Sequence, residues 1–354
     1  MTRTRTFLPL GLLVVILGLG ALASIHELPG EKAVKDRLGF PHSEPCGPII
    51  NRGSPANSRR EPPTPTLRDG PSGVVAGDSA YLVGGVAGLN YSGTKATSLS
   101  TVERFDFSSE TYDRLPPLPE ERNHVGLAAW RGDLFAVGGL RDDLEGGDAA
   151  TDVWRLVPGG KRWTSLASMP TARGAAGAAV IGDRLYLVGG IGKGGRRLNT
   201  LEAYDLVEDR WIRLPSMRVV RDHLGVVAHG GRLYALGGRT IGSAFADFER
   251  YDPATNRWER LAPIPEPTAG FGMAAFGDRI VAAGGEDLER NVLTGSVWSY
   301  DMERDSWSQL ASMSEPRHGF AGVNYEGRLW AFAGSRCSGF HPVRSVRSYL
   351  PRPG

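Results

Sequence analysis

The segment Tyr81-Leu-Val-Gly-Gly85 is a short apolar run that ends in two glycines, and it recurs along the chain. The further copies are Phe135-Ala-Val-Gly-Gly139, Tyr186-Leu-Val-Gly-Gly190, Tyr234-Ala-Leu-Gly-Gly238, Val281-Ala-Ala-Gly-Gly285 and the weaker Trp330-Ala-Phe-Ala-Gly334. The first small residues of successive pairs lie 54, 51, 48, 47 and 49 positions apart. A period of about fifty residues indicates six copies of one structural unit.

Each glycine pair is followed by a loop and then by an alternating segment with an aromatic or apolar end. These segments are Val102-Glu-Arg-Phe105, Val153-Trp-Arg-Leu156, Leu201-Glu-Ala-Tyr204, Phe248-Glu-Arg-Tyr251, Val297-Trp-Ser-Tyr300 and Val346-Arg-Ser-Tyr349. A fourth segment carries an aromatic residue, with a leucine three positions later; the aromatic residues are Tyr112, Trp163, Trp211, Trp258 and Trp307. Each unit therefore reads as four short strands.

Four-stranded units of this kind predict blades around an axis. A single small sheet cannot bury both of its faces, but neighbouring blades cover them and closure of the ring protects the edges. Only residues without a side chain let backbones approach closely near the axis, which explains the glycine pairs. We therefore expect an all-β fold, a six-bladed β-propeller of four-stranded antiparallel blades. The tryptophans are expected to fill the widening space between blades.

Four of the third segments are followed by an aspartate that starts a tight turn, at Asp106, Asp205, Asp252 and Asp301. The glycine pair, this turn and the tryptophan recur together and in order, and the pattern resembles the kelch family from about Arg68 to Tyr349. The resemblance implies the same six-bladed propeller. Tyr112 in place of tryptophan and Ala333 in place of glycine are mild departures from the family pattern.

The N-terminus reads as a targeting segment. Arg3 and Arg5 precede an apolar run over residues 7–23, and Ala21-Leu-Ala23 is a small-x-small cleavage signature. The run is shorter than the about 20 residues that a spanning helix needs. Residues 1–23 are thus predicted to be a signal peptide, or alternatively an N-terminal membrane anchor, in front of an exported chain in the periplasm or outside the cell. Residues 24–66 read as a linker or arm, and residues 67–354 as the propeller.

The propeller ring is expected to close by pairing of the two chain ends. The chain ends soon after Tyr349, so the last blade lacks its own fourth strand, and the arm is the obvious donor. The repeat register points to Ser58, in a polar stretch, whereas Ile49-Ile50 is a better strand former that lies too early. Cys46 and Cys337 are the two cysteines, and an exported chain permits a disulfide between them. The sequence leaves open whether this bridge forms.

Composition excludes several classes of partner and site. The net charge of +2 comes from 41 basic and 39 acidic residues, so nothing predicts nucleic-acid binding. No metal-ligand spacing, nucleophile elbow or phosphate loop is present in the sequence, and we expect no cofactor and no metal. The protein is expected to be a monomer.

Candidate binding residues lie where the loops between second and third strands and the connections between blades meet at one mouth of the channel. In five of six units an arginine stands ten residues after the aromatic position; these are Arg68, Arg122, Arg173, Arg221 and Arg317. The exception is Thr268. These arginines are candidates to grip carboxylates or phosphates, although a blade-to-blade contact is the favoured alternative. Two residues further on, His124 and His223 match a family position that faces the channel mouth, where acidic peptides bind in some kelch propellers. Arg239, Glu286 and Arg336 add charge in the loops after the glycine pairs.

Two functions remain open at this stage. The first is a binding scaffold that takes a protein partner or an anionic small molecule at the channel mouth. The second follows from similarity to exported kelch proteins that act on sialic acid: a sugar-acid mutarotase or epimerase, with arginine on the carboxylate and Glu286 or His223 as general acid or base. We favour the scaffold, because no catalytic constellation is evident in the sequence.

Overall fold

A computed structural model describes residues 46–87, 97–141, 148–241 and 243–352. They belong to one compact unit, Pro41–Gly354. The predicted signal segment and the first part of the arm lie outside the described residues. None of the helical residues among those described forms a segment long and apolar enough to cross a membrane.

The described residues form six four-stranded antiparallel sheets, here called blades one to six in chain order. Blade one is β3 (Ser72–Ala76), β4 (Ser79–Val83), β7 (Val102–Asp106) and β8 (Thr111–Arg114). Blade two is β9 (Gly126–Trp130), β10 (Asp133–Val137), β11 (Val153–Leu156) and β12 (Thr164–Ser165). Blade three is β13 (Gly177–Ile181), β14 (Arg184–Val188), β15 (Leu201–Asp205) and β16 (Arg210–Leu214).

The second half of the ring has the same pattern. Blade four is β17 (Gly225–His229), β18 (Arg232–Leu236), β19 (Phe248–Asp252) and β20 (Arg257–Leu261). Blade five is β21 (Gly272–Phe276), β22 (Arg279–Ala283), β25 (Val297–Asp301) and β26 (Ser306–Leu310). Blade six is β27 (Ala321–Tyr325), β28 (Arg328–Phe332), β29 (Val346–Tyr349) and β2 (Ser58–Glu61). The loops between second and third strands add β5 (Val86–Ala87), β6 (Thr97–Ser98), the 3-10 helix η1 (Lys193–Gly195), β23 (Glu286–Asp287) and β24 (Val292–Thr294).

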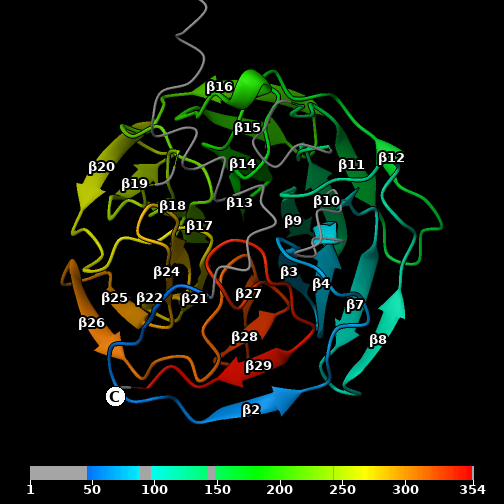
Figure 1. Cartoon of the computed structure of the whole chain (residues 1–354). Helices are drawn as coiled ribbons and strands as arrows, with labels where there is room; N and C mark the ends of the chain where they lie inside the picture. Colours follow the sequence, from blue (N-terminus) through cyan, green and yellow to red (C-terminus); the bar gives the residue numbers. More distant parts are fainter. Residues whose placement is uncertain (1–45, 88–96, 142–147, 242, 353–354) are drawn as a thin grey trace, which may run out of the picture. The chain divides into compact units, whose positions relative to one another are not determined.

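The six blades are arranged around a central axis (Figure 1). The inner strands β3, β9, β13, β17, β21 and β27 contact one another in sequence, and β27 contacts β3 to complete the circle. The apolar core lies between the blades: Leu82 and Phe105 of blade one, for example, pack in one cluster with Trp330 and Phe332 of blade six. The predicted fold, an all-β six-bladed propeller, is confirmed.

A circle of backbone hydrogen bonds explains the glycine pairs. The position ten residues after the strand-four aromatic position is here called the belt position; it holds Arg68, Arg122, Arg173, Arg221, Thr268 and Arg317. The N–H of the second glycine in each blade donates to the backbone carbonyl of the belt position of the next blade. The six bonds, from Gly85, Gly139, Gly190, Gly238, Gly285 and Gly334, are 2.9–3.3 Å long. A side chain at Gly138 would collide with the Arg173 carbonyl, and this glycine has φ +62°. Close approach and left-handed backbone together require glycine here.

The aromatic residues of the fourth strands tie each blade to the preceding one. Trp163, Trp211, Trp258 and Trp307 donate from Nε1 to the carbonyls of Pro116, Ala167, Pro215 and Ala262 at 2.7–2.9 Å. The Tyr112 hydroxyl donates to the Pro62 carbonyl at 3.1 Å, so tyrosine preserves the same contact. The prediction that these side chains occupy the space between blades is therefore confirmed.

The arm closes the ring as an outer strand. β2 pairs antiparallel with β29, with Ser58 opposite Tyr349, so the position indicated by the repeat register is correct although its sequence is polar. An outer strand needs little burial on its solvent side, which explains why Ser58-Arg-Arg-Glu61 suffices. The apolar pair Ile49–Ile50 forms β1 instead and pairs in parallel with β24 of blade five.

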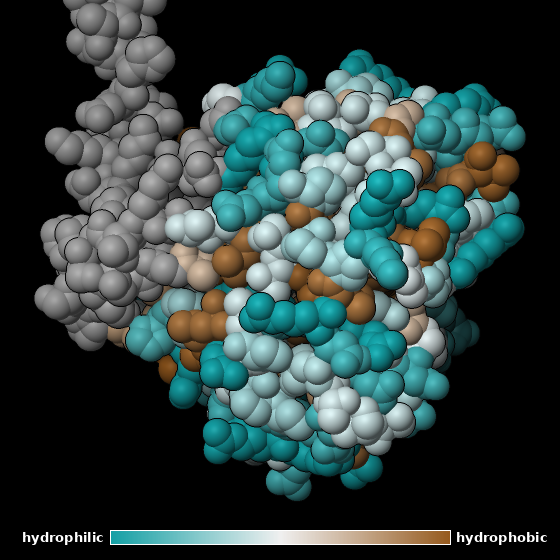
Figure 2. Space-filling model, turned by 90° about the vertical axis from the view of Figure 1, so that its right-hand side faces the viewer, coloured by the Kyte–Doolittle hydropathy of each residue, from teal (hydrophilic) through white to brown (hydrophobic). Residues whose placement is uncertain are grey.

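The outer surface of the ring offers no extended apolar area on the side that Figure 2 presents, where brown hydrophobic residues lie in small patches among hydrophilic ones. Patches of this size are ordinary for a soluble surface.

Candidate functional site

The belt arginines are buried, which corrects their assignment as ligand contacts. Arg122 is 1% exposed, and Arg173, Arg221 and Arg317 are 0% exposed, as is Arg68. A guanidinium that no solvent reaches is unable to grip a ligand at the mouth. The favoured alternative, a blade-to-blade contact, describes only the backbone carbonyl of the belt position, because the guanidinium groups bond within their own blade.

The contacts of Arg173 show what these arginines do. Its Nη1 donates to the carbonyls of Gly189 and Thr200, each at 3.1 Å, and its Nη2 donates to Glu202 Oε2 at 2.8 Å. Glu202 is itself 1% exposed. The guanidinium thus joins strands two and three of its blade at their mouth ends and neutralises a buried carboxylate. Burial lowers the pKa of Arg173 to about 10, which still leaves the group charged at neutral pH.

A second set of backbone bonds narrows the channel two residues after the belt. The residues at this position are Gly70, His124, Ala175, His223, Gly270 and Gly319, all with φ between +49° and +62°. Five successive bonds of 2.7–3.0 Å connect them, from Ala175 N to His124 O, His223 N to Ala175 O, Gly270 N to His223 O, Gly319 N to Gly270 O and Gly70 N to Gly319 O. The histidines are thereby held at the axis by their own backbone.

His124 and His223, both predicted to face the channel mouth, are in contact with each other. Their ring centroids lie 4.6 Å apart in an edge-to-face arrangement. Nδ1 of His124 is 2.7 Å from Asn123 Oδ1, and Nδ1 of His223 bonds Asp222 Oδ1. Burial lowers the pKa of both imidazoles, and the cation of Arg239 acts in the same direction, so the pair is neutral at pH 7.

Arg239 connects this pair to a charged cluster from blades five and six. Its Nη1 donates to Glu286 Oε1 at 2.6 Å, and its Nη2 lies 3.5 Å from His223 Nε2. The other Glu286 oxygen accepts from the Gly339 N–H at 3.0 Å, and His318 Nδ1 lies 3.5 Å from Glu286 Oε1. Burial raises the pKa of Glu286, but His318 and Arg239 outweigh it, and the net pKa is lowered. Glu286 is an ionised carboxylate with both oxygens engaged.

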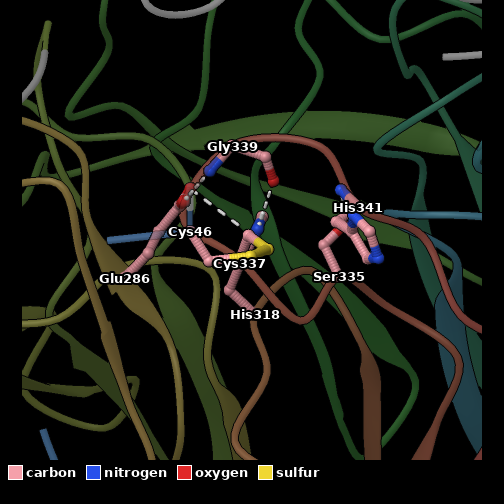
Figure 3. The surroundings of a disulfide bond; sticks show 7 residues. All are labelled: Cys46, Glu286, His318, Ser335, Cys337, Gly339 and His341. Atoms are coloured by element: carbon pink, nitrogen blue, oxygen red, sulfur yellow. Dashed lines mark hydrogen bonds and ion pairs between the residues drawn. A yellow bond between two sulfur atoms is a disulfide. The ribbon is translucent and has the colours of Figure 1, made fainter. Parts of the chain in front are cut away.

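The disulfide between Cys46 and Cys337 is formed, which settles the alternative that the sequence left open. Its Cα atoms are 4.9 Å apart, and it joins residues 291 positions apart. Figure 3 shows it beside Glu286, His318 and Gly339, at the edge of the charged cluster. The bridge therefore fastens the arm to the loop that supplies the Gly339 N–H. From there the arm reaches blade six by way of β1 on blade five.

Asp69 belongs to the charged cluster of Arg239, Glu286 and His318, here called the mouth cluster. The sequence analysis did not identify it. Asp69 is 4% exposed, and its Oδ1 accepts no hydrogen bond. Burial raises its pKa to about 6, the nearby Glu286 adds to the rise, and His318 opposes it. A signal existed, because the position after the belt is polar in four units, at Asp69, Asn123, Asp222 and His318.

The exposed charge at the mouth is mainly basic on blades three and six. Lys193 and Arg196 are exposed in the loop around η1, and Arg336 is exposed in the loop of blade six. On blade two, Arg141 is paired with Asp148 at 2.8 Å. Of the predicted ligand contacts, Arg239 and Glu286 thus lie inside the cluster, the histidines at its centre, and Arg336 at its exposed rim.

Comparison with known proteins agrees with this architecture. Residues 167–334 match the model described as the KLHDC2/KLHL20/DRC7 Kelch-repeats domain, and residues 67–119 and 121–170 match the Kelch motif. Kelch-like protein terF of Aspergillus terreus is 30% identical over 138 residues, covering 37% of this chain and 29% of that protein. Kelch-like protein 33 of Homo sapiens is 31% identical over 131 residues, covering 37% of this chain and 23% of that protein. The chain thus matches less than a third of the length of either relative.

Among solved structures, the one titled "Structure of YjhT" is similar with a TM-score of 0.68 and 16% identity. The match covers 81% of this chain and 95% of that one, and at this identity it speaks for the fold alone. Together with the matched repeats over most of the ring, these likenesses establish that the chain belongs to the kelch-repeat family.

Proposed function

We propose that this protein is an exported binding scaffold that holds an acidic segment of a protein partner on its mouth face. Kelch-repeat domains generally serve as protein-interaction scaffolds. The observation that carries the proposal is the charge on blades three and six of the mouth, where Lys193, Arg196 and Arg336 are exposed. The carboxylates of Asp222 and Glu286 are buried and paired with arginine, and the exposed Glu120 and Asp148 of blade two are paired with Arg122 and Arg141.

The rigidity of the mouth supports this function. Backbone bonds and a disulfide hold the loops before any partner arrives, so binding costs little ordering of the scaffold. Exposed cations on fixed loops attract an anionic segment and speed its association. A protein of this kind acts by presenting a surface, and its export rests on the basic and apolar character of residues 1–23.

The alternative, a mutarotase or epimerase for a carboxylated sugar, gains no support from the proposed acid or base. Glu286 has both oxygens engaged and a lowered pKa, and His223 is engaged with Asp222. A general acid or base needs access to its substrate and a pKa near the working pH. A carboxylated sugar therefore enters the proposal only as a second anionic ligand for the exposed rim.

Fluorescence anisotropy with a labelled glutamate-rich peptide tests the proposal. We expect saturable binding that weakens as salt rises, and a loss of at least tenfold in the double variant Lys193→Glu, Arg196→Glu. The matched control is Arg210→Glu, Arg257→Glu, which reverses two exposed charges at the strand-three-to-four turns on the opposite face. Equal weakening by both double variants, or no binding to the unmodified protein, would refute the mouth as the site. Glucuronate is added as a competitor; displacement of the peptide would extend the site to sugar acids.

A further inference from the structure

Blade five lacks the belt arginine, and the space that this side chain fills elsewhere is hollow. Thr268 occupies the belt position, and its hydroxyl donates to the Gly284 carbonyl at 3.1 Å. A cavity of about 180 Å³, counting its opening to solvent, adjoins it. The polar part of the lining comes from Glu266, Thr268, Thr294, Ser296 and the indole of Trp298.

The other blades show which carbonyls the missing guanidinium would meet. Nη1 of Arg221 donates to the carbonyls of Gly237 and Asp247, at 3.0 and 2.6 Å. In blade four the Asp247 carbonyl also accepts a bond from the N–H of Gly237, the first glycine of the pair. In blade five the N–H of Gly284, the equivalent glycine, bonds the Ser296 carbonyl, so Ser296 corresponds to Asp247. The carbonyls of Gly284 and Ser296 therefore stand where a guanidinium is bound in the neighbouring blade.

Blade two is an occupied version of the same site. Arg122 lies over the Trp154 ring, with Cζ 5.0 Å from the ring centroid, and its Nη2 donates to Glu120 at 2.6 Å. Glu120 stands two residues before the belt position, and Trp154 is the second residue of the third strand. Both contacts favour a cation, the first through the face of the ring and the second through its charge.

Blade five retains the glutamate and the tryptophan of blade two without the arginine, while Ser296 replaces Asp152, the second carboxylate that accepts from Arg122 in blade two. Glu266 stands two residues before Thr268, and Trp298 is the second residue of β25. The Glu266 side chain is 8% exposed, and its Oε2 accepts no hydrogen bond. The nearest cation is Arg52 of the arm, whose Nε lies 3.4 Å from that oxygen while its side chain is 58% exposed. Arg52 thus pairs with Glu266 from the exposed side, but the buried Oε2 still accepts no hydrogen bond, and a buried charge is costly unless it is both paired and hydrogen-bonded.

We propose that the blade-five cavity binds the guanidinium end of a ligand, supplied by a small guanidino compound or by an arginine side chain of a partner protein. The bound group lies against Trp298, donates to Glu266, and reaches the carbonyls that the other blades use for their own arginines. The site shares no residue with the mouth cluster. It therefore stands or falls independently of the proposed binding of acidic segments.

Calorimetric titration with two guanidinium ligands and their neutral counterparts tests this site. The ligands are methylguanidinium and N-acetyl-arginine amide, and the neutral counterparts are methylurea and N-acetyl-citrulline amide. We expect saturable binding of a guanidinium and at least tenfold weaker binding of its counterpart. Binding of both guanidinium ligands indicates a small-molecule site, and binding of the arginine derivative alone indicates a partner side chain. Equal binding of the neutral counterparts would overturn the proposal. It would mean that the carbonyl of the urea group accepts from the unpaired Nε1–H of Trp298, and that the positive charge does not select the ligand.

Three variants locate the binding. Thr268→Arg supplies an internal guanidinium and is expected to abolish binding while raising the melting temperature. Glu266→Gln is expected to weaken binding at least tenfold, against the matched control Glu259→Gln, whose side chain is 62% exposed. Arg52→Ala removes the competing cation and is expected to leave binding equal or tighter. Wild-type affinity in a folded Thr268→Arg or Glu266→Gln variant would overturn the site, and Glu266→Gln decides alone if Thr268→Arg fails to fold.

Discussion

The carboxyl group of Asp69 should make the stability of this propeller depend on pH between about 4 and 7. Burial raises its pKa from 3.8 to about 6 in the folded protein. The folded state therefore retains the proton where the unfolded chain has lost it, and stability falls as the pH rises from 3.8 toward 6. A difference of about 2 units corresponds to about 3 kcal/mol, fully lost above about pH 7.

The substitution Asp69→Asn isolates this effect, because asparagine does not titrate. Urea unfolding of both proteins, with the disulfide intact, is measured from pH 4 to 7.5. Between pH 4 and 7.5 the free energy of unfolding of the wild type should fall by about 2.4 kcal/mol relative to that of the variant, with a plateau above about pH 7; the rest of the roughly 3 kcal/mol is lost below pH 4. Titrating groups that do not interact with Asp69 contribute to both curves and cancel, so the difference reports Asp69 together with its coupling to His318 and Glu286.

An exposed carboxylate provides the control. The Asp278 side chain is 89% exposed, and the difference between the wild type and Asp278→Asn should be flat over the same range. A flat difference for Asp69→Asn as well would refute the reasoning, since it would mean that water reaches the Asp69 carboxyl. A difference of opposite sign would mean that His318 dominates over burial.

Further predictions concern the closure and rigidity of the ring. Arg173→Met should cost about 3–5 kcal/mol of unfolding free energy, because it leaves Glu202 buried without its partner, and urea unfolding measures this loss. Replacing both Cys46 and Cys337 by serine should cost about 2–4 kcal/mol while the far-ultraviolet circular dichroism stays unchanged, because β2 still closes the ring. Ala333→Gly should raise stability by about 0.5–1 kcal/mol in thermal unfolding, because alanine at φ +57° is strained; a lower melting temperature would contradict this.

Much of the fold was predictable because its determinants repeat. The glycine pairs make one contact between neighbouring blades in all six blades, and the strand-four aromatics do so in five, so the same constraints are stated repeatedly along the chain. Even the closing strand followed from the register: Ser58 lies opposite Tyr349 although the local sequence is a weak strand former. A repeated constraint outweighs local propensity.

The candidate site was less predictable, because it depends on the exposure of side chains. Arginine at the belt position has the same chemistry whether it grips a ligand or a neighbouring strand, and only its burial separates the two. Asp69 was not predicted for the same reason, because the sequence Arg68-Asp69 does not show whether the two side chains are exposed or buried. The elevated pKa of Asp69 arises from groups on other blades and from the exclusion of water.

By itself, the sequence determined the number of repeats, the order of strands within each blade and the residues that join one blade to the next, because these contacts recur at a constant spacing. Only the tertiary structure decided that the arginines are internal, that Cys46 meets Cys337, and that blade five holds a cavity where its neighbours hold a guanidinium. For the disulfide the physical reason is distance along the chain, because no period relates residues 291 positions apart. For the arginines and the cavity the reason is burial, because the packing of neighbouring blades decides whether solvent reaches a position that the repeat only locates.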